Sequence, residues 1–203
     1  MFIHDCDAGT EPEWRTFLAT HPFGELIAGG RNRPVPVIVP TQFVVQDDQV
    51  LLHLVGRNPV WDAIAENDRV VVAGSGDWVY IPSDWKAIGD EDPRLGIPTT
   101  YYASVQLTGR ATVIDEPEDV AALLREQLAN LQPDVDTVDP AEHGARLRAI
   151  RGLRIAVEDV RAKFKYGGNV DDAHRNAVVR RLDARGGPGD AAAAAHLRRR
   201  SGW

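Results

Sequence analysis

The residues best placed for chemistry follow a strand-like run at 51–55, where a Gly-Arg turn leads into a helix start. Asn58 occupies the expected N-cap and Pro59 the first helical position, where a missing N–H is tolerated. The N-terminus of a helix carries partial positive charge, and Arg57 beside it adds a full charge. This arrangement predicts an anion site of the kind that a phosphate group uses. An ordinary strand–turn–helix junction with a surface arginine is the alternative.

A second candidate for anion binding is the segment 161–169. In an extended chain Lys163 and Lys165 point to the same side, and two like charges side by side repel unless they share an anion. The pair Gly167-Gly168 then lets the backbone approach another group closely. A solvated strand edge followed by a flexible turn explains the same residues.

Aromatic residues gather in sequence around a long segment, 82–98, that is rich in Pro, Gly and Asp. A loop of this length is often functional. Aromatic walls suit a planar ligand, although the same side chains could pack a core. The aromatic residues are Trp61, Trp78, Tyr80, Trp85, Tyr101 and Tyr102.

Other kinds of site find little support in the residues. The six histidines lack metal-ligand spacing, so no metal site is expected. No serine stands in a nucleophile-elbow context. The single cysteine, Cys6, cannot form an internal disulfide, which favours a reducing compartment.

Composition restricts the partners of the chain. It has 203 residues and a formal net charge of −7, which argues against broad binding to DNA or to anionic membranes. No signal-like start or long apolar run is present. We therefore expect a cytoplasmic protein without a membrane partner.

The elements that must position these residues are mostly strands in the first half and helices in the second. Expected strands cover 25–28, 35–45, 50–55, 69–73, 78–81, 101–114 and 153–157, with a turn at 74–77. Expected helices cover 12–19, 59–66, 115–131, 139–150, 171–185 and 190–200. Prolines at 36 and 40 predict an edge strand, and Gly109 is a candidate bulge. This order predicts a mainly β fold with peripheral helices, built on a small antiparallel sheet or barrel.

Several segments form one ordered pattern: Phe2-Ile3, His21-Pro22-Phe23-Gly24, His53-Leu54 with Asn58-Pro59 and Trp61, Val79 to Trp85, Ile97 to Tyr102, and Lys163 to Val170. Taken together they resemble the PaiB-like family, described as FMN-binding negative transcriptional regulators. The resemblance runs from about Phe2 to Leu182. The chain departs from the family pattern at Thr100, Tyr101, Gly167, Gly168 and Val170.

The resemblance implies a split β-barrel similar to that of pyridoxamine-phosphate oxidase. It further implies a homodimer that holds two FMN molecules at the subunit interface, with the phosphate near 53–58. We expect an FMN-binding domain at 1–182, then a Gly/Pro break and a C-terminal helical extension at 183–203. The expected cofactor-binding residues are His53, Val55, Arg57, Asn58, Trp61, Tyr101, Lys163, Lys165 and Asn169.

Three functions remain open. The first is an FMN-binding negative transcriptional regulator, which would act through a partner or flavin redox state because no DNA-reading element is evident. The second is a flavin-dependent oxidoreductase that uses NAD(P)H, with His53, Tyr80 and Tyr101 as candidate donors near the ring. The third is a degenerate flavin site in an interaction protein, suggested by the replaced motif residues.

Overall fold

The computed structural model describes residues 1–87 and 91–200, which divide into two compact units. Unit 1 combines Met1–Trp14, Ser75–Val105 and the described chain from Arg161 onward. Unit 2 combines Arg15–Gly74 and Gln106–Val160. Three long strands contribute residues to both units: β5 (Arg69–Ile81), β6 (Thr99–Ile114) and β7 (Ile150–Lys165).

Seven strands form one sheet in the order β2-β1-β5-β6-β7-β4-β3. The remaining strands are β1 (Phe23–Ala28), β2 (Val37–Gln42), β3 (Val44–Gln46) and β4 (Gln49–Val55). The strand β2 pairs antiparallel with β1 and lies at an edge, as its prolines predict. At the other edge, the hairpin of β3 and β4 turns at Asp47, which has a positive φ of 51°.

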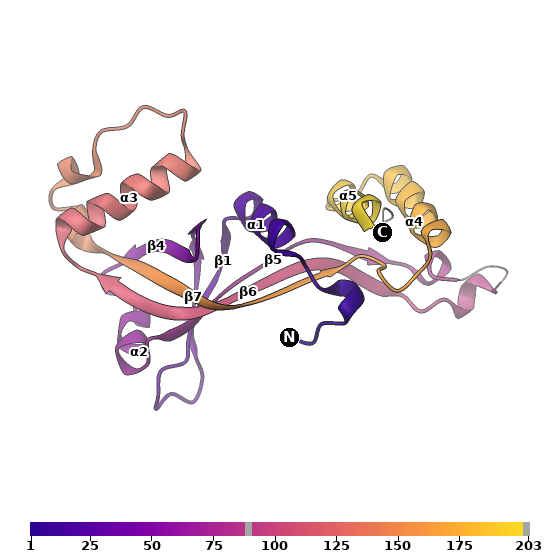
Figure 1. Cartoon of the computed structure of the whole chain (residues 1–203), viewed down its shortest axis with the longest axis horizontal. Coiled ribbons are helices and arrows are strands. Elements are labelled where there is room, and N and C mark those ends of the chain that lie inside the picture. Colours follow the sequence, from indigo (N-terminus) through magenta and orange to yellow (C-terminus); the bar gives the residue numbers. More distant parts are fainter. Residues whose placement is uncertain (88–90, 201–203) are drawn as a thin grey trace. The chain divides into compact units, whose positions relative to one another are not determined.

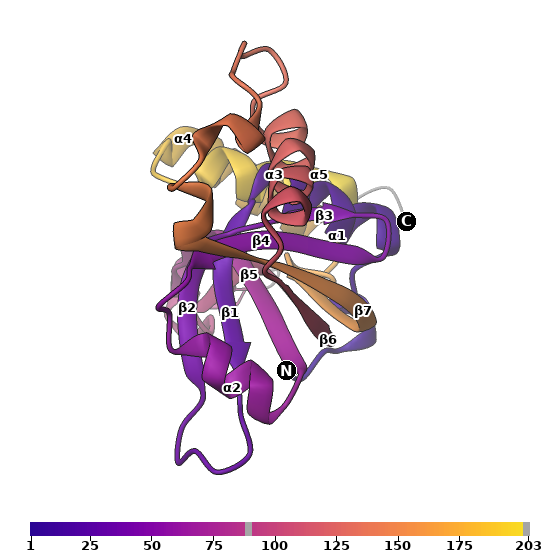
Figure 2. The same cartoon turned by 90° about the vertical axis from the view of Figure 1, so that its left-hand side faces the viewer.

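In unit 2, helices cover parts of this sheet. The short helix α2 (Val60–Glu66) lies beside β1 and β2 (Figure 2). Helix α3 (Pro117–Leu131) packs on β3 and β4, where Leu123 joins Val44 and Leu51 in one apolar cluster. Pro117 at the first helical position explains the clean start of α3. Helix α1 (Glu11–Thr20) precedes β1 and begins in unit 1.

In unit 1, two helices at the end of the chain pack against each other: α4 (Asp172–Arg185) and α5 (Asp190–Arg200) (Figure 1). The Asp171 side chain accepts the His174 N–H and caps α4. Gly186 ends α4 in the left-handed conformation, with φ 58°. Phe164 of β7 and Tyr166, just after this strand, are fully buried in this unit. No described helix is long and apolar enough to cross a membrane.

Several predicted boundaries are wrong. The expected turn at 74–77 lies inside the continuous strand β5, which absorbs the irregularity at Asp77 with a positive φ of 50°. The expected helix at 139–150 is two 3-10 turns, Pro140–His143 and Leu147–Ala149, because Gly144 turns the chain with φ 54° between them. The expected strand at 153–157 extends over all of β7.

Two further segments differ in detail. The expected strand at 35–45 starts later and is divided at Phe43 into β2 and β3. The expected loop at 82–98 contains 3-10 turns at Ser83–Trp85 and Pro93–Leu95, and residues 88–90 lie outside the described chain. Gly109 lies within continuous β6, where a Cβ atom would come 2.2 Å from the Ala156 carbonyl oxygen.

Candidate functional site

The turn between β4 and α2 is fixed by Asn58. Helix α2 begins at Val60, one residue later than predicted, with Pro59 as its N-cap. The Asn58 side-chain oxygen accepts the Val60 N–H at 3.0 Å, and its carbonyl accepts the Trp61 N–H at 3.3 Å. The predicted N-cap position of Asn58 is therefore wrong, because Pro59 occupies it, but the Asn58 side chain still engages a donor of the first helical turn. This bond occupies a backbone donor that we expected to be open to an anion, which leaves Arg57 as the positive group of this turn.

Trp61 serves this turn as a buried support. Its indole N–H donates to the Val55 carbonyl at 3.0 Å, and the Arg151 guanidinium lies 4.9 Å from its ring centroid. Val55 and Arg57 are exposed, and no described residue forms a hydrogen bond or ion pair with the Arg57 guanidinium. The turn thus presents one apolar and one cationic side chain to solvent.

His53 points outward from β4 and is oriented by a buried amide. Its Nδ1 lies 2.7 Å from Gln127 Oε1, and Gln127 Nε2 donates to the Leu51 carbonyl at 3.2 Å. The bond to Leu51 fixes which end of the amide faces His53. An amide oxygen only accepts, so the geometry assigns the proton of the neutral ring to Nδ1. His53 can then offer Nε2 as an acceptor to a ligand.

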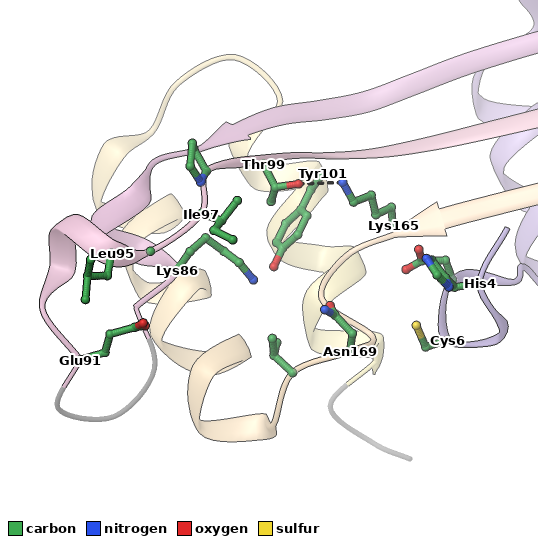
Figure 3. A pocket seen from close by; sticks show the side chains of 14 residues that line it. His4, Cys6, Lys86, Glu91, Leu95, Ile97, Thr99, Tyr101, Lys165 and Asn169 are labelled. Atoms are coloured by element: carbon green, nitrogen blue, oxygen red, sulfur yellow. Dashed lines mark hydrogen bonds between the residues drawn. The ribbon is translucent and has the colours of Figure 1, made fainter. Parts of the chain in front are cut away.

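In unit 1 the structure contains a cavity of about 620 Å³, a size typical of small-molecule sites (Figure 3). Three expected site residues, Tyr101, Lys165 and Asn169, line it together. The other lining residues are His4, Cys6, Asp7, Lys86, Glu91, Leu95, Gly96, Ile97, Pro98, Thr99 and Val170. The segment 91–98 therefore does form one wall of a cavity, as its length suggested.

Lys163 and Lys165 take different partners. Lys163 is buried and its Nζ donates to the Phe2 carbonyl at 3.1 Å, whereas Lys165 Nζ donates to Thr99 Oγ1 at 2.7 Å. Only Lys165 lines the cavity. Their predicted sharing of one anion is therefore replaced by two separate hydrogen bonds.

The electrostatics of the cavity are unusual at Tyr101 and Lys86. The Tyr101 hydroxyl is buried and has no hydrogen-bond partner. Burial, with a smaller effect of the Asp7 carboxylate, raises the pKa of Tyr101 to about 12, so the hydroxyl keeps its proton near neutral pH. Burial and the nearby charge of Lys165 lower the pKa of Lys86 from its usual value.

Sequence reasoning missed Lys86 and the N-terminal contribution to this cavity. A signal for Lys86 existed, because it is one of three lysines in the chain and lies in the segment already singled out. The role of the N-terminus depends on a tertiary contact that no local pattern reveals. A Cβ on Gly168 would come 2.2 Å from the Cys6 carbonyl oxygen, so this glycine lets the turn at 5–7 approach the segment just after β7. Within the described residues, no group of three or more metal-ligating side chains comes together.

Comparisons with known proteins agree with this architecture. The "Protease synthase and sporulation protein PAI 2" of Bacillus subtilis is 25% identical over 173 residues, covering 82% of this chain and 81% of that protein. The FAD and heme binding protein from Mycobacterium smegmatis superposes with a TM-score of 0.62 at 16% identity, covering 80% of this chain and 75% of that one. The conserved hypothetical protein Rv2991 from Mycobacterium tuberculosis gives 0.60 at 15% identity, covering 84% and 94%.

These comparisons confirm two predictions, the resemblance to the PaiB-like family and the mainly β split-barrel fold with peripheral helices. A family model described as "Putative FMN-binding domain" matches residues 1–159. The matched range includes the turn at Arg57 and the cavity residue Tyr101, and it ends before Lys163. The chain belongs to this family of FMN-binding domains.

Proposed function

We propose that this protein binds FMN and acts as a homodimer. The observation that carries the proposal is the family match over 1–159, which includes the turn with its exposed, unpaired arginine. FMN supplies a phosphate, which needs cationic contacts, and a planar ring with polar edges. The dimer rests on the resemblance to the PaiB-like family.

Arg57 is the proposed phosphate contact. Its neighbours are held in place by the Val60 N–H bond to the Asn58 side chain and by the indole bond of Trp61, so the exposed guanidinium stands on a fixed turn. A charge-assisted hydrogen bond is stronger than a neutral one, and a guanidinium matches the geometry of phosphate oxygens. Because the backbone donors of the first turn of α2 are engaged by Asn58, the side chain must supply most of the affinity here.

The remaining expected residues have roles that follow from their surroundings. His53 Nε2 is proposed to accept a hydrogen bond from the flavin, and exposed Val55 to contact an apolar part of it. Tyr101, Lys165 and Asn169 form a second group on the cavity of unit 1. Lys163 is proposed to hold the N-terminal segment through Phe2. When bound, FMN would supply redox chemistry.

A titration that follows quenching of flavin fluorescence tests the phosphate contact. Arg57→Ala should weaken FMN binding by about 1.5–3 kcal/mol, which is roughly 10- to 150-fold in Kd. Riboflavin lacks the phosphate, so its affinity should change little in this variant. Arg180→Ala removes a charge from an exposed position on α4 and should bind FMN as the parent does. Equal FMN affinity of parent and Arg57→Ala would exclude this phosphate site.

Regulation and oxidoreduction remain the two candidate uses of the flavin. The Bacillus relative is named for protease synthesis and sporulation, and the resemblance to PaiB-like regulators favours a regulatory use. We propose that this use involves a protein partner or the flavin redox state, since the net charge of −7 opposes broad DNA binding. Oxidation of NAD(P)H in air by the flavin-loaded protein, faster than by free FMN, would identify an oxidoreductase instead.

A further inference from the structure

The cavity of unit 1 contains positive charge that no carboxylate neutralises by direct contact. Within the described chain, neither Lys86 nor Lys165 forms an ion pair, and Lys165 donates to the neutral hydroxyl of Thr99. Asp7 and Glu91 also line the cavity, and Glu91 has an interaction of its own. The two ammonium groups are close enough for Lys165 to lower the pKa of Lys86.

The Tyr101 hydroxyl is the second independent observation. Tyr101 is 2% exposed, and its hydroxyl has no hydrogen-bond partner. Figure 3 shows the ring directing this hydroxyl into the cavity, toward the region where Lys86 and Asn169 point. A buried donor without an acceptor destabilises a protein, so such groups call for an explanation. Since Tyr101 stays protonated near neutral pH, its hydroxyl can donate to a hydrogen-bond acceptor in the cavity.

The local backbone is arranged around this hydroxyl. A Cβ on Gly167 would come 2.9 Å from the Tyr101 oxygen, and Gly167 adopts a positive φ of 67°. A larger residue would fill the space beside the hydroxyl and would be strained in this conformation. The neighbouring Arg175 donates to the Gly167 carbonyl at 3.0 Å and helps to hold the turn. Because residue 167 is glycine, no side chain from this position fills the space beside the hydroxyl.

Part of the cavity lining is apolar. Leu95, Ile97 and Pro98 line it, and the first two side chains are largely exposed. A bare inorganic ion would use only the cationic side of a space of about 620 Å³. An anionic group attached to an apolar body would use both parts of the lining, which is the usual composition of a small-molecule site.

We infer that this cavity binds the carboxylate or phosphate of a small organic molecule, with Lys86, Lys165 and the Tyr101 hydroxyl as its donors. The positive pair attracts the anion, the hydroxyl donates to one of its oxygens, and Asn169 can add an amide donor. The inference stands on the cavity alone and does not require FMN binding. Two sources share this chemistry, a separate organic acid and the phosphate of FMN, which would then lie in this cavity instead of at Arg57.

Calorimetric titration of the flavin-free protein with benzoate and with inorganic phosphate tests the first source. Lys86→Gln and Lys165→Gln should each weaken binding of at least one probe by a factor of about ten or more, the size of a lost charge-assisted contact. Arg180→Gln removes the same charge outside the cavity and should bind like the parent. The inference is overturned if the cavity variants and Arg180→Gln bind benzoate, phosphate and FMN equally well, or if none of the three binds at millimolar concentration.

Tyr101→Phe tests the contribution of the hydroxyl to anion binding without changing either lysine. It removes only the hydroxyl, so the free protein should melt at the same or a higher temperature because an unsatisfied donor disappears. Its affinity for the anionic probe should nevertheless fall several-fold. A variant that is less stable and binds the probe unchanged would contradict the role of the hydroxyl.

The same variants distinguish the two sources. If FMN is the source, Lys86→Gln should weaken FMN at least tenfold while riboflavin binding stays constant. If a separate acid is the source, benzoate or phosphate binding should fall in Lys86→Gln while FMN affinity stays constant. A third outcome is a parent protein that binds benzoate or phosphate but no flavin, with probe binding lost in Lys86→Gln. This outcome would support the cavity and contradict the proposed function.

Discussion

At the residue scale, one glycine explains how the N-terminal turn comes to the cavity. Gly168 has no room for a side chain, because a Cβ would approach the Cys6 carbonyl oxygen to 2.2 Å. The sequence predicted a close approach at Gly167-Gly168 but could not say what approaches. Its partner lies more than 150 residues away in the chain, so only the folded structure identifies it.

We expect Gly168→Ala to destabilise the protein by about 1–3 kcal/mol, since backbone must shift to admit the methyl group. Gly29→Ala is the matched control, because a Cβ at Gly29 would meet no atom within 4 Å. Chemical denaturation compares the two variants with the parent. Equal stability of Gly168→Ala and Gly29→Ala would mean that the turn at 5–7 is not held against this glycine.

A second prediction concerns His196, a buried histidine of α5. Its Nε2 lies 2.8 Å from Asp77 Oδ2, and its ring stacks on Tyr166 at 4.2 Å between centroids. Burial lowers the pKa of His196 below its usual 6.5, although the hydrogen bond that the ring makes to the Asp77 carboxylate opposes the shift. The folded state then binds fewer protons than the unfolded state. The contribution of neutral His196 to the stability of the fold is complete above pH 6.5. It is lost as the pH falls through the lower pKa of the folded state.

We therefore expect the melting temperature to fall between about pH 7 and pH 5, and His196→Gln to reduce this dependence. His143→Gln changes an exposed histidine and should leave the pH dependence as in the parent. Thermal melts at several pH values give the answer. An unchanged slope in His196→Gln would assign the acid sensitivity to other groups.

At the element scale, a buried carboxylate joins α4 to α5. Asp190 is 2% exposed and accepts bonds from Arg185 at 2.8 and 2.5 Å and from the Gly187 N–H at 2.8 Å. The Arg185 guanidinium holds the pKa of Asp190 below its usual range. A second pair, Arg198 with Asp183, joins the same helices on the surface, where Asp183 is 49% exposed.

Asp190→Asn should destabilise the protein by about 1.5–3 kcal/mol, because a buried charge-assisted network loses its acceptor. Asp183→Asn should change stability by less than about 1 kcal/mol, as exposed pairs generally do. Urea unfolding of both variants measures the difference. Similar small effects would show that the turn at 186–189 holds the helices together without this carboxylate.

Elements with strong local signals could be predicted from the sequence. Pro117 and Asp171 mark the starts of α3 and α4, and the turn at Asp47 marks the hairpin. The errors fall where tertiary pairing overrides local composition. The glycines at 74–77 looked like a turn, yet β5 continues through them beside β6, where the Ser75 hydroxyl donates to that of Ser104.

The candidate site was predicted only in part for a related reason. The residue types at Arg57 and Asn58 revealed a turn with a charge, although the helix begins one residue later than predicted, with Pro59 as its N-cap. The grouping of Tyr101, Lys165 and Asn169 with Lys86 depends on how β6, β7 and the segment 82–98 come together. Spacing along the chain carries no information about such a grouping.

At the scale of the whole molecule, the net charge predicts how strongly the protein binds DNA. With a net charge of −7, the protein should show little affinity for random-sequence DNA near physiological salt, where positive charge supplies most non-specific affinity. A mobility-shift titration measures this. Tight, salt-dependent binding to random DNA would require a concentrated basic surface and would contradict regulation through a partner or the flavin.

The central claim is that this chain holds FMN, and an absorbance spectrum tests it most directly. The purified protein is incubated with excess FMN, separated from free flavin by gel filtration and scanned, with light scattering on the same column. We predict retained flavin bands at one FMN for each chain, in a peak with the mass of a dimer. A colourless protein after reconstitution would contradict the claim, and the cavity of unit 1 would then be studied with other anionic ligands.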